Sequence, residues 1–307
     1  MVVVGRQNMT TEQSHRTIEH ISSAYPPRIK TFRSEIIKNI PKIPNTRETV
    51  AHLTAMPTNK LMLIFLTWRM RFVPARRRDV KIWSGGVDPQ VFASMLGNLN
   101  PLLANVTNGA DLTPHLSNLV NTLGYSMPST TLPAKRRDDK DGVLTKMGLH
   151  HFHVGEVSAK NPKARSGKLV FADVSDTEFR IIAISDHDAF DIGSEEWTRL
   201  FGISNRYIQS QLPAETVGFM AYPTMSSGHS THLFLFARYC NDMMTKIDAC
   251  LDDPVYINNI YNKGESHEGQ VKAIPKKPKF KWHFNDNNFG IYETKNGVFF
   301  QLAICPR

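Results

Sequence analysis

The pattern of hydrophobic and polar residues changes along the chain from helical spacing to strand alternation. Up to about residue 142, apolar residues recur every three or four positions, most clearly over 59–70, 88–105 and 111–123. This spacing predicts buried or amphipathic helices. The segment 125–142 is poor in large apolar residues and rich in Ser, Thr, Pro and charge, which is typical of a linker. We therefore predict a helical N-terminal domain over residues 1–142.

Beyond the linker, short apolar runs with β-branched and aromatic residues replace the helical pattern. Three such runs follow one another at residues 149–154, 168–174 and 178–185. They predict an antiparallel meander. Asn296 and Gly297 stand between two further strand patterns and predict a hairpin, because both residues tolerate positive φ. Residues 143–307 should thus form a mixed domain built on an antiparallel sheet, which makes the protein α+β.

Charge indicates a polyanionic partner. The chain has 37 Lys and Arg against 28 Asp and Glu, a net charge of +9, and such an excess favours RNA or another nucleic acid. Over the segment 68–83, arginines alternate with aromatic residues, and these side chains suit phosphates and unpaired bases respectively. A solvated basic loop with buried aromatics would give the same pattern.

Three basic segments are candidates for contacting nucleic acid. The first lies in the N-terminal domain, the second follows the histidine-rich strand, and the third precedes the C-terminal strands. Their residues are Arg69, Arg71, Arg76, Arg77 and Arg78; then Lys160, Lys163 and Arg165; and finally Lys276, Lys277, Lys279 and Trp282.

Other sequence features favour a cytoplasmic protein. Cys240, Cys250 and Cys305 are an odd number without a C-x-x-C pair, which favours reduced thiols. The longest apolar run, Leu61 to Leu66, is far shorter than the roughly 20 residues that span a bilayer, so we expect no membrane partner. The motifs G-x-x-x-x-G-K-[ST], G-x-G-x-x-G and G-x-S-x-G are missing, so ATPase, dinucleotide-binding and serine-hydrolase functions lack their usual anchors.

The candidate chemistry lies in the predicted meander. The sequence GLHHFHVGE places His151 and His153 on one face of the first strand, because side chains alternate along a strand. The sequence SDHD places Asp186 and His187 after the third strand. Histidine exchanges protons near neutral pH and is a common metal ligand.

Three hypotheses fit these residues. The first is metal-independent RNA cleavage without a cofactor, with histidines as general acid and base and cations that stabilise the phosphate. Its residues are His151, His153, His187, Lys168 and Arg180. The second is a metal-dependent hydrolase or nuclease that binds zinc or manganese. Its ligands would be His151, His153, Asp186 and His187. The third is a non-catalytic nucleic-acid-binding or interaction protein whose histidines form structural hydrogen bonds.

A family resemblance favours the first hypothesis. Residues 148–190 run from a histidine-bearing strand through a basic loop and the strands KLVFADV and FRIIAIS to a closing histidine. This order resembles the core of the RelE/ParE superfamily of bacterial toxins, whose RelE branch cleaves messenger RNA, usually on the ribosome, without a metal. The resemblance implies a growth-arresting toxin or phage-defence effector with a neutralising partner. The ParE branch is not a nuclease, and this chain carries large additions on both sides of the core.

Overall fold

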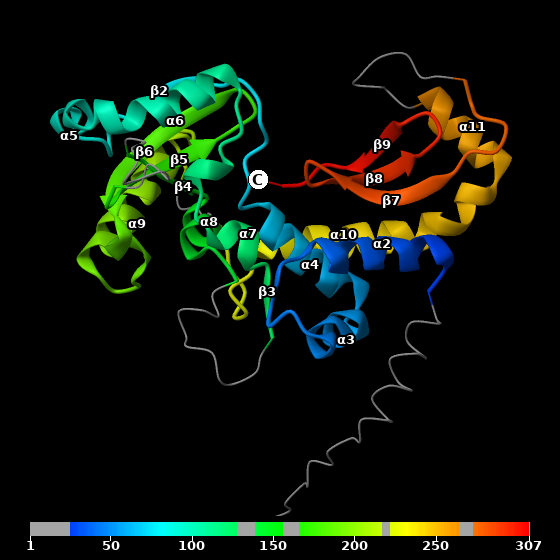
Figure 1. The fold of residues 1–307 in the computed structure, drawn as a ribbon. Coiled ribbons are helices and arrows are strands. Elements are labelled where there is room, and N and C mark those ends of the chain that lie inside the picture. Colours follow the sequence, from blue (N-terminus) through cyan, green and yellow to red (C-terminus); the bar gives the residue numbers. More distant parts are fainter. Residues whose placement is uncertain (1–24, 128–138, 156–165, 217–221, 264–272, 307) are drawn as a thin grey trace, which may run out of the picture. The chain divides into compact units, whose positions relative to one another are not determined.

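The computed structural model describes residues 25–127, 139–155, 166–216, 222–263 and 273–306 (Figure 1). Helices and sheets are both extensive, so the predicted α+β class is confirmed. The candidate contacts Lys160, Lys163 and Arg165 lie outside the described residues. None of the described helices is long and apolar enough to cross a membrane.

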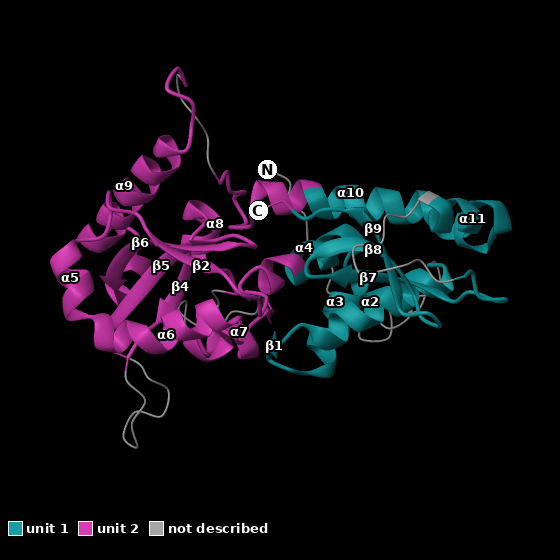
Figure 2. Ribbon diagram, turned by 90° about the horizontal axis from the view of Figure 1, so that it is seen from above, with its two compact units in different colours: residues 1–65, 236–305 teal, residues 66–235, 306–307 magenta. Residues whose placement is uncertain are grey.

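The chain forms two compact units, and their limits differ from the predicted division at residue 142 (Figure 2). Unit 1 comprises residues 1–65 and 236–305, and unit 2 comprises residues 66–235 with the last two residues. The chain passes between them within α4 (Thr58–Arg69) and α10 (Thr231–Ile247). The predicted linker falls inside unit 2, because a helix that precedes it packs on the sheet that follows it.

Unit 2 contains a four-stranded sheet in the order β2-β6-β5-β4. The strands are β2 (Asp79–Ile82), β4 (His150–His153), β5 (Lys168–Val174) and β6 (Glu178–Asp186). β4, β5 and β6 pair antiparallel, which confirms the predicted meander. β2 is an addition that the sequence did not predict, and it pairs parallel with β6. The sheet is therefore mixed rather than purely antiparallel.

Helices cover both faces of this sheet (Figure 1). On one face, Leu99, Leu102 and Val106 of α6 (Leu96–Asn108) pack against strand residues such as Phe152. On the other, α9 (Glu195–Ser210) and α8 (Gly142–Met147) pack against residues such as Phe171. The remaining elements are α5 (Pro89–Ser94), η1 (Thr113–His115), α7 (Leu119–Thr122), β3 (Tyr125–Ser126) and η3 (His187–Phe190).

Unit 1 combines helices with a three-stranded antiparallel sheet in the order β7-β8-β9. Its elements are α2 (Pro27–Asn39), β1 (Lys42–Ile43), α3 (Arg47–Ala55), η4 (Asp248–Asp252), α11 (Pro254–Lys263), β7 (Phe280–Asn285), β8 (Asn288–Glu293) and β9 (Val298–Ala303). The predicted hairpin is confirmed between β8 and β9, where Gly297 has a φ of 69°.

Trp282 belongs to the core of unit 1. Its ring stacks on Phe289 with centroids 5.3 Å apart, and its Nε1 donates to Asp248 Oδ1 over 2.7 Å. The side chain is fully buried. Trp282 therefore offers no surface on which a base could stack, contrary to the expectation from sequence.

Candidate active site

Three predicted site residues lie together at one end of the unit 2 sheet. The ring centroids of His187 and His153 are 5.4 Å apart, and those of His153 and His151 are 6.1 Å apart. His151 and His153 share a face of β4 because side chains alternate along a strand. His187 begins η3, directly after β6 ends at Asp186. The predicted gathering of these histidines is therefore present in the structure.

The three histidines differ in exposure. His187 is exposed, the side chain of His151 retains 12% of its accessible surface, and His153 is buried. The ring of Phe190 lies 4.8 Å from that of His151, centroid to centroid. We call His187, His153 and His151 the histidine line. Only its outer member is fully accessible to a large substrate.

Asp141 ends the histidine line and was not predicted as a site residue. Its Oδ2 lies 3.0 Å from His151 Nδ1, and its Oδ1 accepts the N–H groups of Val143 and Leu144 at the start of α8. The sequence signal was an Asp directly before a short apolar run, which is typical of a helix N-cap.

The charge of Asp141 is stabilised inside unit 2. Burial alone would raise its pKa, but the charge and hydrogen bond of His151, the N–H of Leu144 and the charge of Arg71 lower the pKa to about 2. The Asp141 carboxylate lies at ion-pair distance from the His151 ring.

Two other histidines have structural roles. His115 Nδ1 lies 3.1 Å from the carbonyl oxygen of His153, and its Nε2 lies 3.1 Å from Asn105 Nδ2. On the opposite face of β4, His150 Nε2 lies 3.0 Å from the carbonyl oxygen of Met70. Burial lowers the pKa of both His115 and His150. Both rings are therefore favoured in the neutral form, and they fix the backbone around the histidine line.

Lys168 and Arg180 do not join the histidine line. Lys168 Nζ lies 3.5 Å from Asp186 Oδ2, but Lys168 precedes Leu169, the residue paired with His153, so it points to the opposite face. Arg180 is six residues before Asp186 on an extended strand, which is about 20 Å. Its guanidinium instead contacts Glu178 at 2.6 Å and the Tyr207 hydroxyl at 3.3 Å.

The arginines of segment 68–83 are divided between core and surface. Arg71 and Arg78 are buried and donate to the carbonyl oxygens of Leu123 and Ser175. These two arginines stabilise the fold and are not surface contacts. Around them, Arg69 lies over the Trp68 and Phe72 rings, Arg76 pairs with Asp176 at 2.9 Å, and exposed Arg77 donates to the Thr107 carbonyl oxygen.

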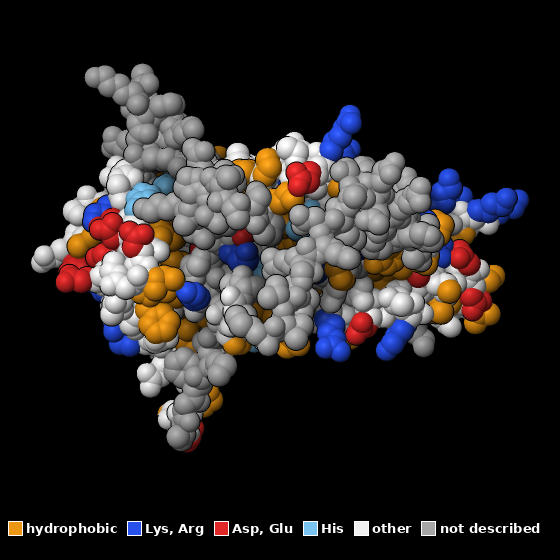
Figure 3. All heavy atoms as spheres, turned by 90° about the horizontal axis from the view of Figure 1, so that it is seen from below, with side chains coloured by type: hydrophobic (Ala, Val, Ile, Leu, Met, Phe, Trp, Pro, Cys, Tyr) orange, Lys and Arg blue, Asp and Glu red, His pale blue; other side chains and the backbone are white. Residues whose placement is uncertain are grey.

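The remaining basic candidates are exposed. Lys276, Lys277 and Lys279 lie on the surface of unit 1, before β7. On the face drawn in Figure 3, the described Lys and Arg side chains are scattered among Asp and Glu side chains. The described basic side chains therefore form no single patch on that face.

Neither a metal centre nor a known relative identifies the site. Within the described ranges, no group of three or more His, Cys, Asp or Glu side chains is arranged to hold a metal ion. The zinc or manganese alternative therefore gains no support from these residues. No protein-family model, no curated protein and no solved structure matches the chain.

Proposed function

We propose that the protein is a metal-independent ribonuclease in which His187 and His153 supply the general acid and general base. One observation carries this proposal: an exposed histidine leads through two further histidines to a buried, ionised aspartate. Imidazole groups serve such proton transfers because their unperturbed pKa lies near neutrality.

The chemistry follows the usual course of RNA transesterification. A neutral imidazole takes the proton of the ribose 2′-hydroxyl, whose oxygen attacks the adjacent phosphorus. A protonated imidazole gives its proton to the departing 5′-oxygen, which leaves a cyclic phosphate and a free 5′-hydroxyl. His151, held by Asp141, is a positioning residue for His153 in this scheme.

The biological setting is part of the proposal. The RelE/ParE resemblance and the net charge of +9 both favour cytoplasmic RNA as the substrate, and the resemblance adds the ribosome and a neutralising protein as partners. Expression of the active protein should then arrest growth, and expression of an inactive variant should not.

The test is cleavage of labelled RNA and labelled DNA by the full chain, with and without EDTA. We expect EDTA-resistant cleavage of RNA alone. Since His187 is exposed, His187→Ala should fold normally and lose at least 100-fold in rate, the lower range for general acid and base groups.

The matched control is His232→Ala, which removes an exposed histidine from α10. It should leave the rate unchanged. Cleavage that disappears with EDTA would contradict the metal-independent mechanism and favour the metal-dependent nuclease. RNA binding without cleavage, on free RNA and on ribosomes, would leave the non-catalytic binding protein as the explanation.

A further inference from the structure

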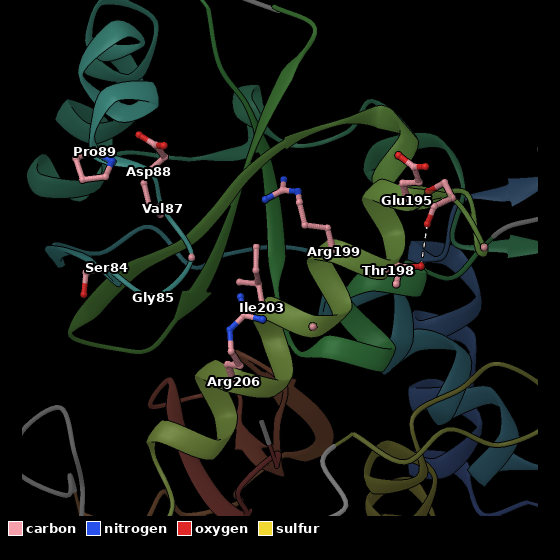
Figure 4. Close-up of a pocket in the computed structure, with 14 residues that line it drawn as sticks. Ser84, Gly85, Val87, Asp88, Pro89, Glu195, Thr198, Arg199, Ile203 and Arg206 are labelled. Atoms are coloured by element: carbon pink, nitrogen blue, oxygen red, sulfur yellow. Dashed lines mark hydrogen bonds between the residues drawn. The ribbon is translucent and has the colours of Figure 1, made fainter.

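A second site in unit 2 lies apart from the histidine line. A pocket of about 780 Å³ is formed by the loop 84–89, which follows β2, and by residues 193–206, mostly from α9 (Figure 4). β2 and β6 run parallel, with Ile82 beside Ile181. The pocket is lined by segments that leave the carboxyl ends of these two strands. In open, mostly parallel α/β sheets, ligands bind beyond the carboxyl ends of the strands.

The loop that forms one wall of the pocket contains two glycines, Gly85 and Gly86. A Cβ atom on Gly86 would lie 2.3 Å from the Ile182 carbonyl oxygen, and one on Gly85 would lie 2.5 Å from the Trp83 ring. Glycine permits this close approach of the chain. The two glycines therefore let this loop lie close against β6 and the Trp83 ring.

The opposite wall is a stripe of α9 that carries Arg199, Gly202 and Arg206. Spacings of three and four residues place them on one face of the helix. Glycine weakens a helix interior, yet packing does not demand it at 202, because the atom nearest to an added Cβ would be Arg206 Nη1 at 3.7 Å. The glycine keeps the space between the two arginines open.

The lining carries two basic and two acidic side chains. Arg199 is held in place, since its Nη2 lies 2.8 Å from Glu196 Oε2 and donates to the Ile184 carbonyl oxygen. Arg206 is exposed and has no carboxylate partner among the residues that the structure describes. The Asp88 carboxylate already accepts two backbone N–H groups at the start of α5. Glu195 is the other acidic residue of the lining.

We propose that this pocket binds a small phosphate-bearing molecule, such as a nucleoside diphosphate. The guanidinium fork of exposed Arg206 matches phosphate oxygens, and Nη1 of Arg199 is a second donor beside the groups that already contact Glu196 and Ile184. The volume falls within the roughly 300–1,000 Å³ of small-molecule sites. The inference is independent of the proposed ribonuclease activity.

Calorimetric titration of the full chain with pyrophosphate and with adenosine diphosphate tests the inference. The protein should bind at least one of them at millimolar concentration or below. Arg206→Gln should weaken binding at least tenfold, and Gly202→Glu, which introduces a carboxylate between the arginines, should abolish it. Arg238→Gln removes an exposed arginine from α10 and should have no effect.

Three results would overturn the inference. They are no binding of either compound at millimolar concentration, equal binding by Arg206→Gln, or binding of a single-stranded RNA oligonucleotide alone. Circular dichroism would verify that the variants fold, as expected for an exposed Arg206 and an unobstructed Cβ at position 202.

Discussion

At the scale of single residues, Asp141 connects local structure to the candidate chemistry. Its carboxylate caps α8 through two backbone N–H groups and also lies beside His151 Nδ1. The contact with His151 is an ion pair only when Asp141 is ionised, and the negative charge also strengthens the two cap hydrogen bonds. One residue thereby fixes the start of a helix and the inner end of the histidine line.

Asp141 should make the stability of the protein depend on acid pH. Its pKa falls from an ordinary 3.8 to about 2 on folding. The ionised carboxylate therefore adds its full amount to the free energy of unfolding above about pH 4, and this amount is lost as the pH falls from about 4 to about 2. The shift corresponds to about 2 kcal/mol. Asp141→Asn should lower the free energy of unfolding by about that amount at pH 7 and by much less at pH 2, as measured by urea denaturation.

The control for this substitution is Asp88→Asn, which changes the exposed N-cap residue of α5. Asparagine also caps helices well, so this variant reports the cost of the exchange at a cap that lacks a histidine partner. It should lose less stability than Asp141→Asn at pH 7. Equal losses in the two variants would contradict the role assigned to the Asp141 charge.

At the scale of elements, the loop after β2 depends on glycine for its position. Gly86 lies between β6 and α9, where an added Cβ would meet the Ile182 carbonyl oxygen at 2.3 Å and Ile203 Cγ2 at 2.6 Å. Neither neighbour moves easily, since one is strand backbone and the other belongs to the buried core. The close packing of three elements therefore sets the residue type at this position.

Replacement of this glycine should be costly. Gly86→Ala should lower the free energy of unfolding by about 1–3 kcal/mol, the usual cost of overpacking, and thermal unfolding would show it as a lower Tm. Gly167→Ala, where an added Cβ meets nothing within 4 Å, should leave the Tm nearly unchanged. A Gly86→Ala protein as stable as the Gly167→Ala protein would show that the loop can shift.

At the scale of the whole molecule, the excess of positive charge should act through exposed lysines. Changing Lys276, Lys277 and Lys279 to Gln should weaken binding of single-stranded RNA. If each lysine contacts one phosphate, the slope of log K against log salt should fall by about 2. Fluorescence anisotropy at several salt concentrations measures this slope.

The matched variant removes the same charge elsewhere, by changing the exposed Lys38, Lys60 and Lys246 to Gln. It should reduce binding less, because these lysines come from three separate helices. The same fall in slope for both triple variants would mean that net charge alone drives binding and that the 276–279 segment has no special role.

The sequence by itself determined the features that depend on neighbours along the chain. Alternation predicted the meander of β4, β5 and β6 and placed His151 and His153 on one face. The Asn-Gly pair predicted the β8–β9 hairpin, because its backbone preference is local. The α+β class follows from these periodicities.

Only the tertiary structure decided the features that depend on contacts between distant segments. It placed Arg71 and Trp282 in cores, added β2 beside β6, and set Asp141 against His151. The sequence shows the type of a basic or aromatic residue but not whether its side chain is exposed or buried. A short strand such as β2 gains its hydrogen bonds only from the edge of a sheet that another part of the chain supplies. Composition therefore predicted binding to nucleic acid. Packing decided which basic and aromatic side chains remain exposed for such binding.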